Sequence, residues 1–388
     1  FIDGYNASAF FISLGQISLP LDSLNFGIDL DQVKIDKPFE NTVTCKSGPQ
    51  PDVYLVLSES QTLPTHFKEI KASDELLASF RSGDGKLHPL YVETFGGGTW
   101  VTNFSVMTGL SSFDFGVQAP YVTQLMEGRV KGAPPEVLAR CGYRTVTIMP
   151  MNFNFVGEGA FLKSIGFQEI YDAETLGVPT HGVRDKAYFE FARKLIAEHR
   201  AGDKRPLFLA IQTLFPHGPY DHPLVPENEL PDVFTENAHA NEYMRRVAAA
   251  RMDLGAFATW LKADPGPDGS VLAEYGDHQS EATKAFAETA YKDGRLFSDP
   301  RSPIYETFFA VHGFGTAVDY AALKQAEDVG FLSARLIKAA GLSTSPVFED
   351  LLRLSDLCAG RYFSCVDHQD ELDRHLKKRA DAGMLSVN

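Results

Sequence analysis

Short apolar runs and longer amphipathic segments alternate along the chain from residue 52 onward. The first apolar run, residues 53–57, leads directly into the polar triplet Ser58-Glu59-Ser60. An apolar run of this length is typical of a buried strand in a parallel sheet. The same pattern predicts strands at residues 53–57, 91–95, 144–149, 207–213, 271–275 and 307–311.

Amphipathic segments lie between these runs and predict helices. Residues 186–196 place their apolar side chains at the spacing of one helix face. Predicted helices span residues 100–108, 185–199 and 241–262. Strands that alternate with helices favour an α/β fold, with a mainly parallel central sheet and helices on both faces.

The sequence divides into three regions. Residues 1–50 mix apolar positions with Gly, Pro and Asp, which suits a linker or extended arm, and the apolar segment 7–14 is too short to span a membrane. Residues 51–330 carry the α/β alternation. Residues 331–388 predict a helical C-terminal extension packed on that domain, in which the charged segment 370–379 forms a solvated helix face.

Composition limits the class of partner. Of the 388 residues, 44% are hydrophobic and 22% are charged, as in ordinary folded domains. The formal net charge of -15 argues against nucleic acid as a partner, because binding to a phosphate backbone needs clustered Lys and Arg. A small phosphate-bearing substrate stays compatible, since one bound cation can invert the local field.

The four cysteines allow more than one reading. Cys358 and Cys365 are close in sequence and could form a local disulfide, as in an exported domain. Cys45 and Cys141 are far apart, and Cys141 precedes an apolar strand, where a buried free thiol is equally compatible. The chain contains no CxxC pair, so no structural zinc site is predicted.

Three predicted strands end in residues that can bind a metal ion. Glu59 follows the first strand, His217 follows the strand at 207–213, and Asp277-His278 follow the strand at 271–275. Parallel α/β proteins place their ligands at the carboxyl ends of strands. A buried carboxylate also needs a compensating charge. The pattern therefore predicts a metal site at this edge of the sheet.

A glycine-rich turn precedes one predicted helix. Gly96-Gly97-Gly98-Thr99 follows the strand expected at 91–95. Glycines allow a close backbone approach to a ligand, and a helix N-terminus favours an anion. Thr99 is therefore placed where a nucleophilic hydroxyl would be activated. The alternative is that the glycines form a simple turn and Thr99 is a helix N-cap.

Four motifs in this order resemble those of a known family. They are Leu57-Ser58-Glu59-Ser60, Gly96-Gly97-Gly98-Thr99 with Met107-Thr108-Gly109-Leu110, Phe215-Pro216-His217-Gly218-Pro219-Tyr220, and Gly276-Asp277-His278. Together they are similar to the motifs of lipoteichoic acid synthases and of bacterial phosphoglycerol and phosphoethanolamine transferases. These enzymes belong to the alkaline phosphatase/sulfatase superfamily. The resemblance covers residues 50–315 and implies that residues 51–330 form a sulfatase-like catalytic domain.

The resemblance implies roles for individual residues. Glu59, Thr99, Asp277 and His278 would bind one divalent cation, and Thr99 would be the nucleophile. This ligand set suits Zn²⁺ or Mn²⁺. The motif residue His217 would line the substrate site. The leaving alkoxide could be protonated by His217, or alternatively by His222 or His312.

Two further histidines are weaker candidates for binding the substrate. His222 lies beside a proline and could equally be a loop residue without a role. His312 ends the strand at 307–311, which is expected to face the same edge of the sheet.

Departures from related families narrow the expected chemistry. The chain lacks the C/S-x-P-x-R motif of sulfatases, which argues against sulfate ester hydrolysis. The additional ligands for the second zinc of alkaline phosphatases are not evident, so a single metal ion is expected. Ser58-Glu59-Ser60 and Gln279-Ser280-Glu281 replace features of the phosphoethanolamine transferases that act on lipid A, which favours the phosphoglycerol branch.

The resemblance therefore predicts the extracytoplasmic catalytic domain of a transferase anchored in the bacterial inner membrane. Its first residue is Phe1 rather than Met, as expected of a fragment that membrane helices precede. A monomeric domain would move a phospholipid head group to a periplasmic or cell-surface glycan through a phosphothreonine intermediate. The alternatives are a soluble phosphodiesterase or phosphonate hydrolase of the same superfamily, and a non-catalytic pseudoenzyme that binds glycan or lipid.

Overall fold

The structure is a computed structural model that describes residues 26–387 except 227–228, 231, 291–294 and 325. The apolar segment expected at 7–14 lies outside the described residues. No helix within the described part of the chain combines the length and the apolar composition needed to cross a bilayer.

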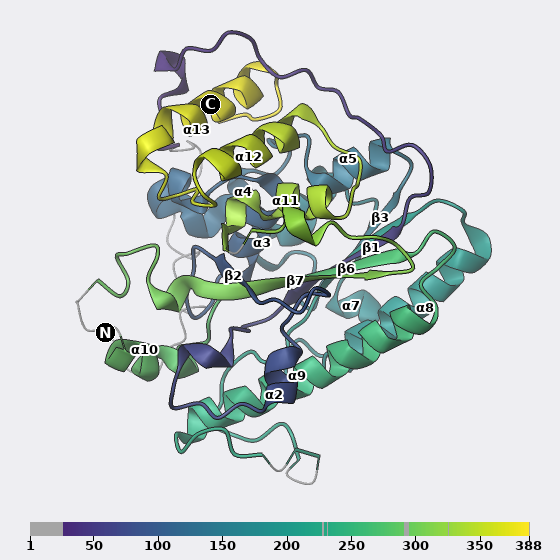
Figure 1. The fold of residues 1–388 in the computed structure, drawn as a ribbon, viewed down its shortest axis with the longest axis vertical. Coiled ribbons are helices and arrows are strands. Elements are labelled where there is room, and N and C mark those ends of the chain that lie inside the picture. Colours follow the sequence, from purple (N-terminus) through teal and green to yellow (C-terminus); the bar gives the residue numbers. More distant parts are fainter. Residues whose placement is uncertain (1–25, 227–228, 231, 291–294, 325, 388) are drawn as a thin grey trace.

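One eight-stranded sheet runs through the molecule in the order β4-β3-β5-β1-β6-β7-β2-β8 (Figure 1). Only β7 among these strands runs antiparallel to its neighbours β6 and β2, so the predicted mainly parallel sheet is confirmed. The strands are β1 (Asp52–Ser58), β2 (His88–Tyr91), β3 (Arg144–Ile148), β4 (Glu169–Tyr171), β5 (Leu207–Gln212), β6 (Ser270–Gly276), β7 (Glu306–Phe314) and β8 (Glu327–Asp328).

Helices cover both faces of the sheet, as predicted (Figure 1). Alternate residues of β1 point to opposite faces, because successive side chains of a strand do so. Leu55 joins a core beneath α3 and α11, whereas Val56 joins a second core against α8 and α9. The helices are α2 (Asp74–Ala78), α3 (Thr99–Thr108), α4 (Val122–Leu125), α5 (Pro134–Arg140), α6 (Glu158–Ser164), α7 (Ala173–Leu176), α8 (Lys186–Gly202), α9 (Ala238–Ala263), α10 (Lys284–Ala290), α11 (Leu332–Ala339), α12 (Pro346–Leu357) and α13 (Gln369–Asp381).

All six predicted strands and all three predicted helices overlap elements of the structure, although the strand expected at 91–95 shares only Tyr91 with β2. The strand expected at 91–95 is wrong in its bounds, because β2 ends at Tyr91 and the chain then turns toward the glycines. Strands β4 and β8 have only three and two residues, too few to produce an apolar pattern. The C-terminal region holds three helices, α11, α12 and α13. Helix α13 buries Leu372 and Leu376, so only part of its surface is solvated.

The segment before β1 lies against the C-terminal helices and α5 (Figure 1). The Phe39 N–H donates to the Lys378 carbonyl at 3.3 Å, and Thr44 forms a β-bridge with Thr344. A disulfide joins Cys45 to Cys141 directly after α5, so Cys141 is not the free thiol that its position allowed. The local disulfide considered at the C-terminus, Cys358–Cys365, is also present.

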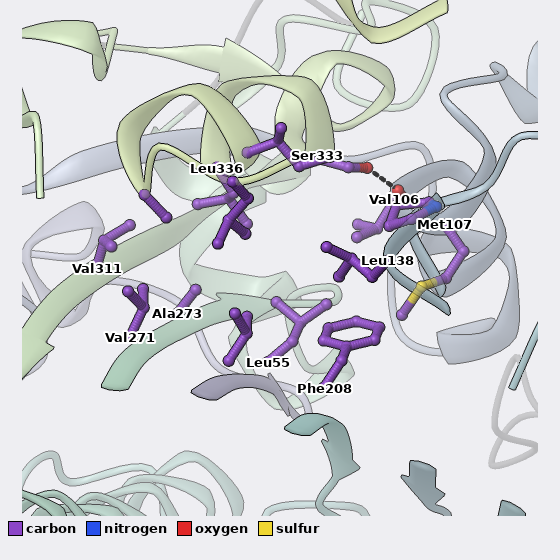
Figure 2. Close-up of a pocket in the computed structure, with 15 residues that line it drawn as sticks. Leu55, Val106, Met107, Leu138, Phe208, Val271, Ala273, Val311, Ser333 and Leu336 are labelled. Carbon is purple, nitrogen blue, oxygen red and sulfur yellow. Dashed lines mark hydrogen bonds between the residues drawn. The ribbon is translucent and has the colours of Figure 1, made fainter. Parts of the chain in front are cut away.

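Helix α11 packs on the same face of the sheet as α3. Figure 2 shows Leu336 of α11 above Leu55, Ala273 and Val311 of the sheet, around an apolar cavity of about 40 Å³. The hydroxyl of Ser333 donates to the Val106 carbonyl and so ties α11 to α3. The helical C-terminal extension is therefore part of the same core as the sheet.

We expect Leu336→Ala to lower the free energy of unfolding by about 2–5 kcal/mol, because it enlarges an existing apolar cavity that the rigid sheet cannot close. Leu357→Ala, at a side chain that is 39% exposed at the end of α12, should change it by less than about 0.5 kcal/mol. Urea denaturation of both variants measures the difference. Equal losses would show that α11 is not part of the main core.

Candidate active site

Four candidate side chains converge because the three strands that precede them are neighbours. β1 lies between β5 and β6, and all three strands run parallel. Glu59 follows β1, His217 follows β5, and Asp277 and His278 follow β6. All four residues lie at one edge of the sheet, as the sequence predicts for residues that directly follow buried parallel strands.

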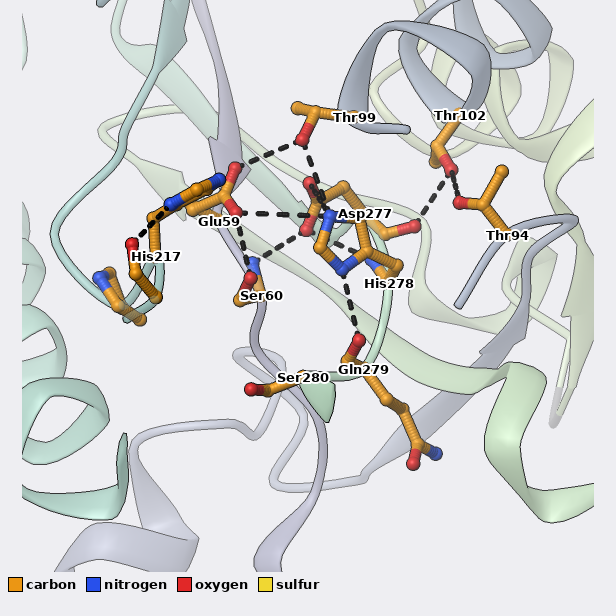
Figure 3. Close-up of polar contacts among 12 residues, drawn as sticks. Glu59, Ser60, Thr94, Thr99, Thr102, His217, Asp277, His278, Gln279 and Ser280 are labelled. Atoms are coloured by element: carbon orange, nitrogen blue, oxygen red, sulfur yellow. Dashed lines mark hydrogen bonds and ion pairs between the residues drawn. The ribbon is translucent and has the colours of Figure 1, made fainter. Parts of the chain in front are cut away.

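Glu59, Asp277 and His278 form a buried cluster (Figure 3). One potential ligand atom from each residue lies within 4.8 Å of the other two. His278 Nε2 is 3.8 Å from Glu59 Oε1 and 3.3 Å from Asp277 Oδ2. In the described ranges, no other group of His, Cys, Asp or Glu side chains has this geometry.

Thr99 is the first residue of α3, and its hydroxyl faces the cluster. Thr99 Oγ1 donates to Glu59 Oε2 at 3.1 Å and lies 3.3 Å from His278 Nε2 (Figure 3). Gly98 takes the N-cap position with φ 86°, a left-handed conformation that favours glycine. The alternative in which Thr99 is the N-cap is therefore wrong.

The start of α3 is fixed to the loop after β6. The Gly96 N–H donates to the Gln279 carbonyl at 2.9 Å, and Thr102 Oγ1 donates to the Asp277 carbonyl at 2.7 Å. These bonds hold the helix N-terminus, where the partial positive charge of the helix dipole is located, beside the cluster. That field favours negative charge on the Thr99 oxygen.

The two oxygens of Asp277 have different surroundings. Oδ1 accepts the N–H groups of Ser60 at 2.7 Å and His278 at 2.9 Å. Oδ2 is buried, has no hydrogen-bond donor, and faces His278 Nε2. A buried carboxylate oxygen without a donor is costly unless a cation approaches it. The donor set of two carboxylates, one imidazole and one hydroxyl therefore fits a divalent metal ion such as Zn²⁺ or Mn²⁺.

Electrostatics support the same conclusion. Burial, together with the nearby Asp277 charge, raises the pKa of Glu59 to about 8, although His278 partly offsets both effects. Two carboxylates this close in a buried setting repel each other unless a positive charge lies between them. The cluster therefore has the electrostatic character of a cation site.

Two residues that the sequence did not indicate stabilise the wall beneath the cluster. Glu274 of β6 accepts the Ser58 hydroxyl at 3.2 Å. Arg251 of α9 binds both oxygens of Glu274 at 2.7 and 2.8 Å. The ion pair is buried and has matched charges, so it adds no net charge next to Glu59.

His217 lines a small pocket that reaches the cluster, together with Ser60, Gly96 and His278. Its Nδ1 lies 2.7 Å from the Gly218 carbonyl oxygen, and this contact assigns the proton to Nδ1. Nε2 is then the nitrogen left to face a bound molecule.

Asp185 fixes the chain just before His217. It stands at the N-cap position of α8, but its side chain caps no helical N–H. Instead its Oδ1 accepts the N–H groups of Leu214 at 3.1 Å and Phe215 at 3.0 Å. Asp185 is therefore a partner of the loop after β5 and not a member of the cluster.

The other two candidate histidines lie elsewhere. His222 is exposed, its Nδ1 is 2.6 Å from Asp221 Oδ1, and it does not line the pocket. The placement of His312 at the same edge is wrong: β7 runs antiparallel, so His312 pairs with Leu272 near the start of β6. An apolar run predicts a strand but not its direction.

Sequence reasoning missed three residues that complete the pocket, Tyr220, Ser280 and Glu281. Ser280 Oγ donates to the Tyr220 hydroxyl at 2.7 Å, which links the loop after β5 to the loop after β6. The signal was present, since Tyr220 closes the motif around His217, and Ser280 and Glu281 follow His278 closely.

Comparison with known sequences identifies relatives of the chain. The sulfatase family profile matches residues 51–303. An uncharacterized protein of Haemophilus influenzae is 26% identical over 78% of this chain and 56% of its own length. A Rhizobium meliloti protein named "Putative cyclic beta-1,2-glucan modification protein" is 23% identical over 96% of this chain and 57% of its own. The chain thus spans little more than half of either relative.

A shorter match and two solved structures extend the comparison. Phosphoglycerol transferase I of Escherichia fergusonii is 28% identical over 37% of this chain and 19% of its own. Streptococcus pyogenes phosphoglycerol transferase GacH, solved with sn-glycerol-1-phosphate, has a TM-score of 0.64 and 16% identity, covering 99% of this chain and 98% of its own. The periplasmic domain of Escherichia coli EptC, solved with Zn, has a TM-score of 0.52 and 14% identity, covering 81% and 88%. The two structures show a common fold.

We expect the chain to bind one equivalent of Mn²⁺ or Zn²⁺, and Asp277→Asn to weaken that binding by more than about tenfold, because it removes a charged ligand. Asp264→Asn, at an exposed side chain beyond the end of α9, is the matched control and should bind as the parent does. Calorimetric titration after chelator treatment measures both. Parent-like binding by Asp277→Asn would contradict the assigned site.

The chelated protein should lose stability as the pH rises. The folded-state pKa of Glu59 is raised from 4.5 to about 8, so the folded state binds this proton more tightly than the unfolded state does. The resulting contribution is complete below about pH 4.5 and is lost as the pH passes through about 8. Urea unfolding of chelated protein at pH 6 and pH 9 measures the loss, and Glu59→Gln should reduce the difference.

Proposed function

The chain belongs to the sulfatase family, and we propose that it is a metal-dependent transferase that moves a phospholipid head group through Thr99. The observation that carries this proposal is the position of the Thr99 hydroxyl. It lies at the N-terminus of α3, within 3.3 Å of both Glu59 Oε2 and His278 Nε2. A hydroxyl in this setting is suited to act as a nucleophile.

The nucleophile favours phosphoryl over sulfuryl transfer. Thr99 takes the position after the glycines, and the sequence has no C/S-x-P-x-R motif, which sulfate ester hydrolysis in this family requires. A relative named phosphoglycerol transferase I also supports phosphoryl transfer.

In the first step, Thr99 Oγ1 attacks the phosphorus of a phosphodiester head group. Glu59 Oε2, which accepts the hydrogen bond of Thr99, is the first acceptor for the hydroxyl proton. The bond between phosphorus and the diacylglycerol oxygen breaks, and His217, in its imidazolium form with protons on both ring nitrogens, donates the Nε2 proton to that oxygen. A divalent cation held by Glu59, Thr99, Asp277 and His278 would stabilise the negative charge on the attacking and phosphoryl oxygens.

In the second step, an acceptor hydroxyl attacks the phosphothreonine at Thr99. His217, now neutral, accepts the hydroxyl proton, and the bond between phosphorus and Thr99 Oγ1 breaks. The head group phosphate is then attached to the acceptor, and Thr99 recovers its proton. A glycan is the proposed acceptor, in keeping with the name of the Rhizobium meliloti relative. Phosphoglycerol is the proposed head group, in keeping with the names of the transferase relative and of GacH.

We propose a periplasmic location for the catalytic domain, residues 51–330, with residues 331–388 packed on it as an extension. The disulfides Cys45–Cys141 and Cys358–Cys365 leave none of the described cysteines free, which fits an oxidising compartment. In the full-length protein, residues 1–50 would link the domain to an anchor in the inner membrane and to its lipid donor.

Thr99→Ala should lower kcat for head-group release by at least about 10³-fold, because the nucleophile is lost while three metal ligands remain. Thr99→Ser keeps a hydroxyl at the same atom and should retain activity within about tenfold. The assay incubates each variant with Mn²⁺ and short-chain phosphatidylglycerol, followed by mass spectrometry of intact protein. A head-group adduct on the parent, absent in Thr99→Ala, is expected.

Retention of full activity by Thr99→Ala would contradict the proposal. Products distinguish the acceptor: a glycan that gains glycerol phosphate supports transfer, whereas free glycerol phosphate alone, with glycan present, identifies a phosphodiesterase that uses water.

A further inference from the structure

The first turns of α9 bury an unusual number of charged and polar side chains. Glu242, Tyr243, Arg245 and Arg246 are all less than 9% exposed. Arg246 is one of the largest fully buried side chains of the molecule, with 1% exposure. A buried guanidinium is costly unless its donors are bonded, so its partners show what this part of α9 holds in place.

Arg246 binds both ends of the segment that carries His217. Nη1 donates to the His217 carbonyl at 2.7 Å, and Nη2 donates to the His222 carbonyl at 3.1 Å. Nε donates to Glu242 Oε1 at 2.8 Å, which balances the charge. The guanidinium carbon also lies 5.0 Å from the centre of the Tyr220 ring, midway along the same segment. One side chain thus contacts residues 217–222 at three points.

Neighbouring bonds connect this arrangement to the rest of the pocket. Glu242 Oε1 also accepts the Leu224 N–H at 2.8 Å. The Tyr220 hydroxyl donates to the Pro216 carbonyl at 2.8 Å and accepts from Ser280. Tyr243 of the same helix donates its hydroxyl to the Ser60 carbonyl at 2.6 Å. Helix α9 therefore holds the segment of His217 and the loop of Glu59 in one frame.

We infer that Arg246 is a positioning residue for His217, which rests on the proposed function of His217 as the proton donor. Arg246 does not itself line the pocket, but it contacts His217 and Tyr220, which do. Its bond to the His217 carbonyl fixes the backbone position of that residue beside the pocket. Its bond to the His222 carbonyl fixes the other end of the segment and so limits rotation of the segment about His217. A displacement of about 1 Å at a reacting group can cost about 10²-fold in rate, so this position matters for the chemical step.

The adjacent residue offers a matched control. Arg245 is buried in the same turn of α9 and also binds backbone carbonyls, but those of the following loop: Nη2 donates to Val225 at 2.8 Å, and Nη1 donates to Leu230. Arg245 has no bond to His217 or His222. Substitution of either residue therefore removes a buried arginine from this turn, but only substitution of Arg246 removes the contact with His217.

The experiment compares Arg246→Lys with Arg245→Lys in head-group release from short-chain phosphatidylglycerol with Mn²⁺. We expect Arg246→Lys to lower kcat by about 10- to 100-fold with KM changed by less than about threefold, because lysine cannot bind both carbonyls. Arg245→Lys should keep kcat within about threefold. Mn²⁺ content and melting temperature, measured on both, show whether each variant is folded. Arg246→Gln, which retains one donor group, replaces Arg246→Lys if the latter fails to fold.

A double-mutant cycle tests whether Arg246 acts through His217. In a His217→Ala background, Arg246→Lys should cause no further fall in kcat, since the group it positions is absent. Equal and additive losses in both backgrounds would overturn the inference, as would equal effects of the two lysine variants or a His217→Ala variant with full activity. Thr99→Ala, assayed in parallel, separates this outcome from failure of the proposed function: its retained activity would refute the nucleophile, whatever Arg246 does.

Discussion

The burial of two carboxylates side by side is the constraint on which the rest of the site depends. Glu59 and Asp277 lie at the ends of adjacent strands inside a protein whose sheet is apolar on both faces. Such an arrangement is unfavourable alone. The backbone N–H groups on Asp277 Oδ1, the Thr99 hydroxyl on Glu59, and the imidazole of His278 each reduce the cost. The remaining deficit is positive charge, which a divalent cation would supply.

The order of the strands brings the other candidate residues of the site next to these two carboxylates. Because β1 lies between β5 and β6, candidate ligands at the ends of two strands meet the loop that follows the third. Helix α3 enters from above with its N-terminus fixed to the loop after β6, and α9 supports the loops from below. The proposed nucleophile and the candidate metal ligands are thus held at the ends of regular elements, whereas the residues that would contact a substrate lie on the loops.

Much of this architecture could be predicted from the sequence. Long apolar runs that end in Glu59 or Asp277 indicate both a buried strand and a polar edge. His312 shows the limit, since direction depends on tertiary pairing that no local pattern contains. Arg246 shows another: an arginine in an amphipathic helix is ordinarily solvent-facing, and its burial depends on a loop about 25 residues earlier. Cys45 and Cys141 pair because the arm folds back on α5, which their spacing alone cannot reveal.

The Cys45–Cys141 bond has a topological consequence. It closes a covalent ring of about 100 residues, and both Glu59 and Thr99 belong to that ring, whereas Asp277 and His278 lie outside it. A cation bound by all four residues would therefore crosslink the ring to the part of the polypeptide outside it. Production in a reducing cytosol would open this ring and leave the segment of Glu59 and Thr99 without its covalent closure.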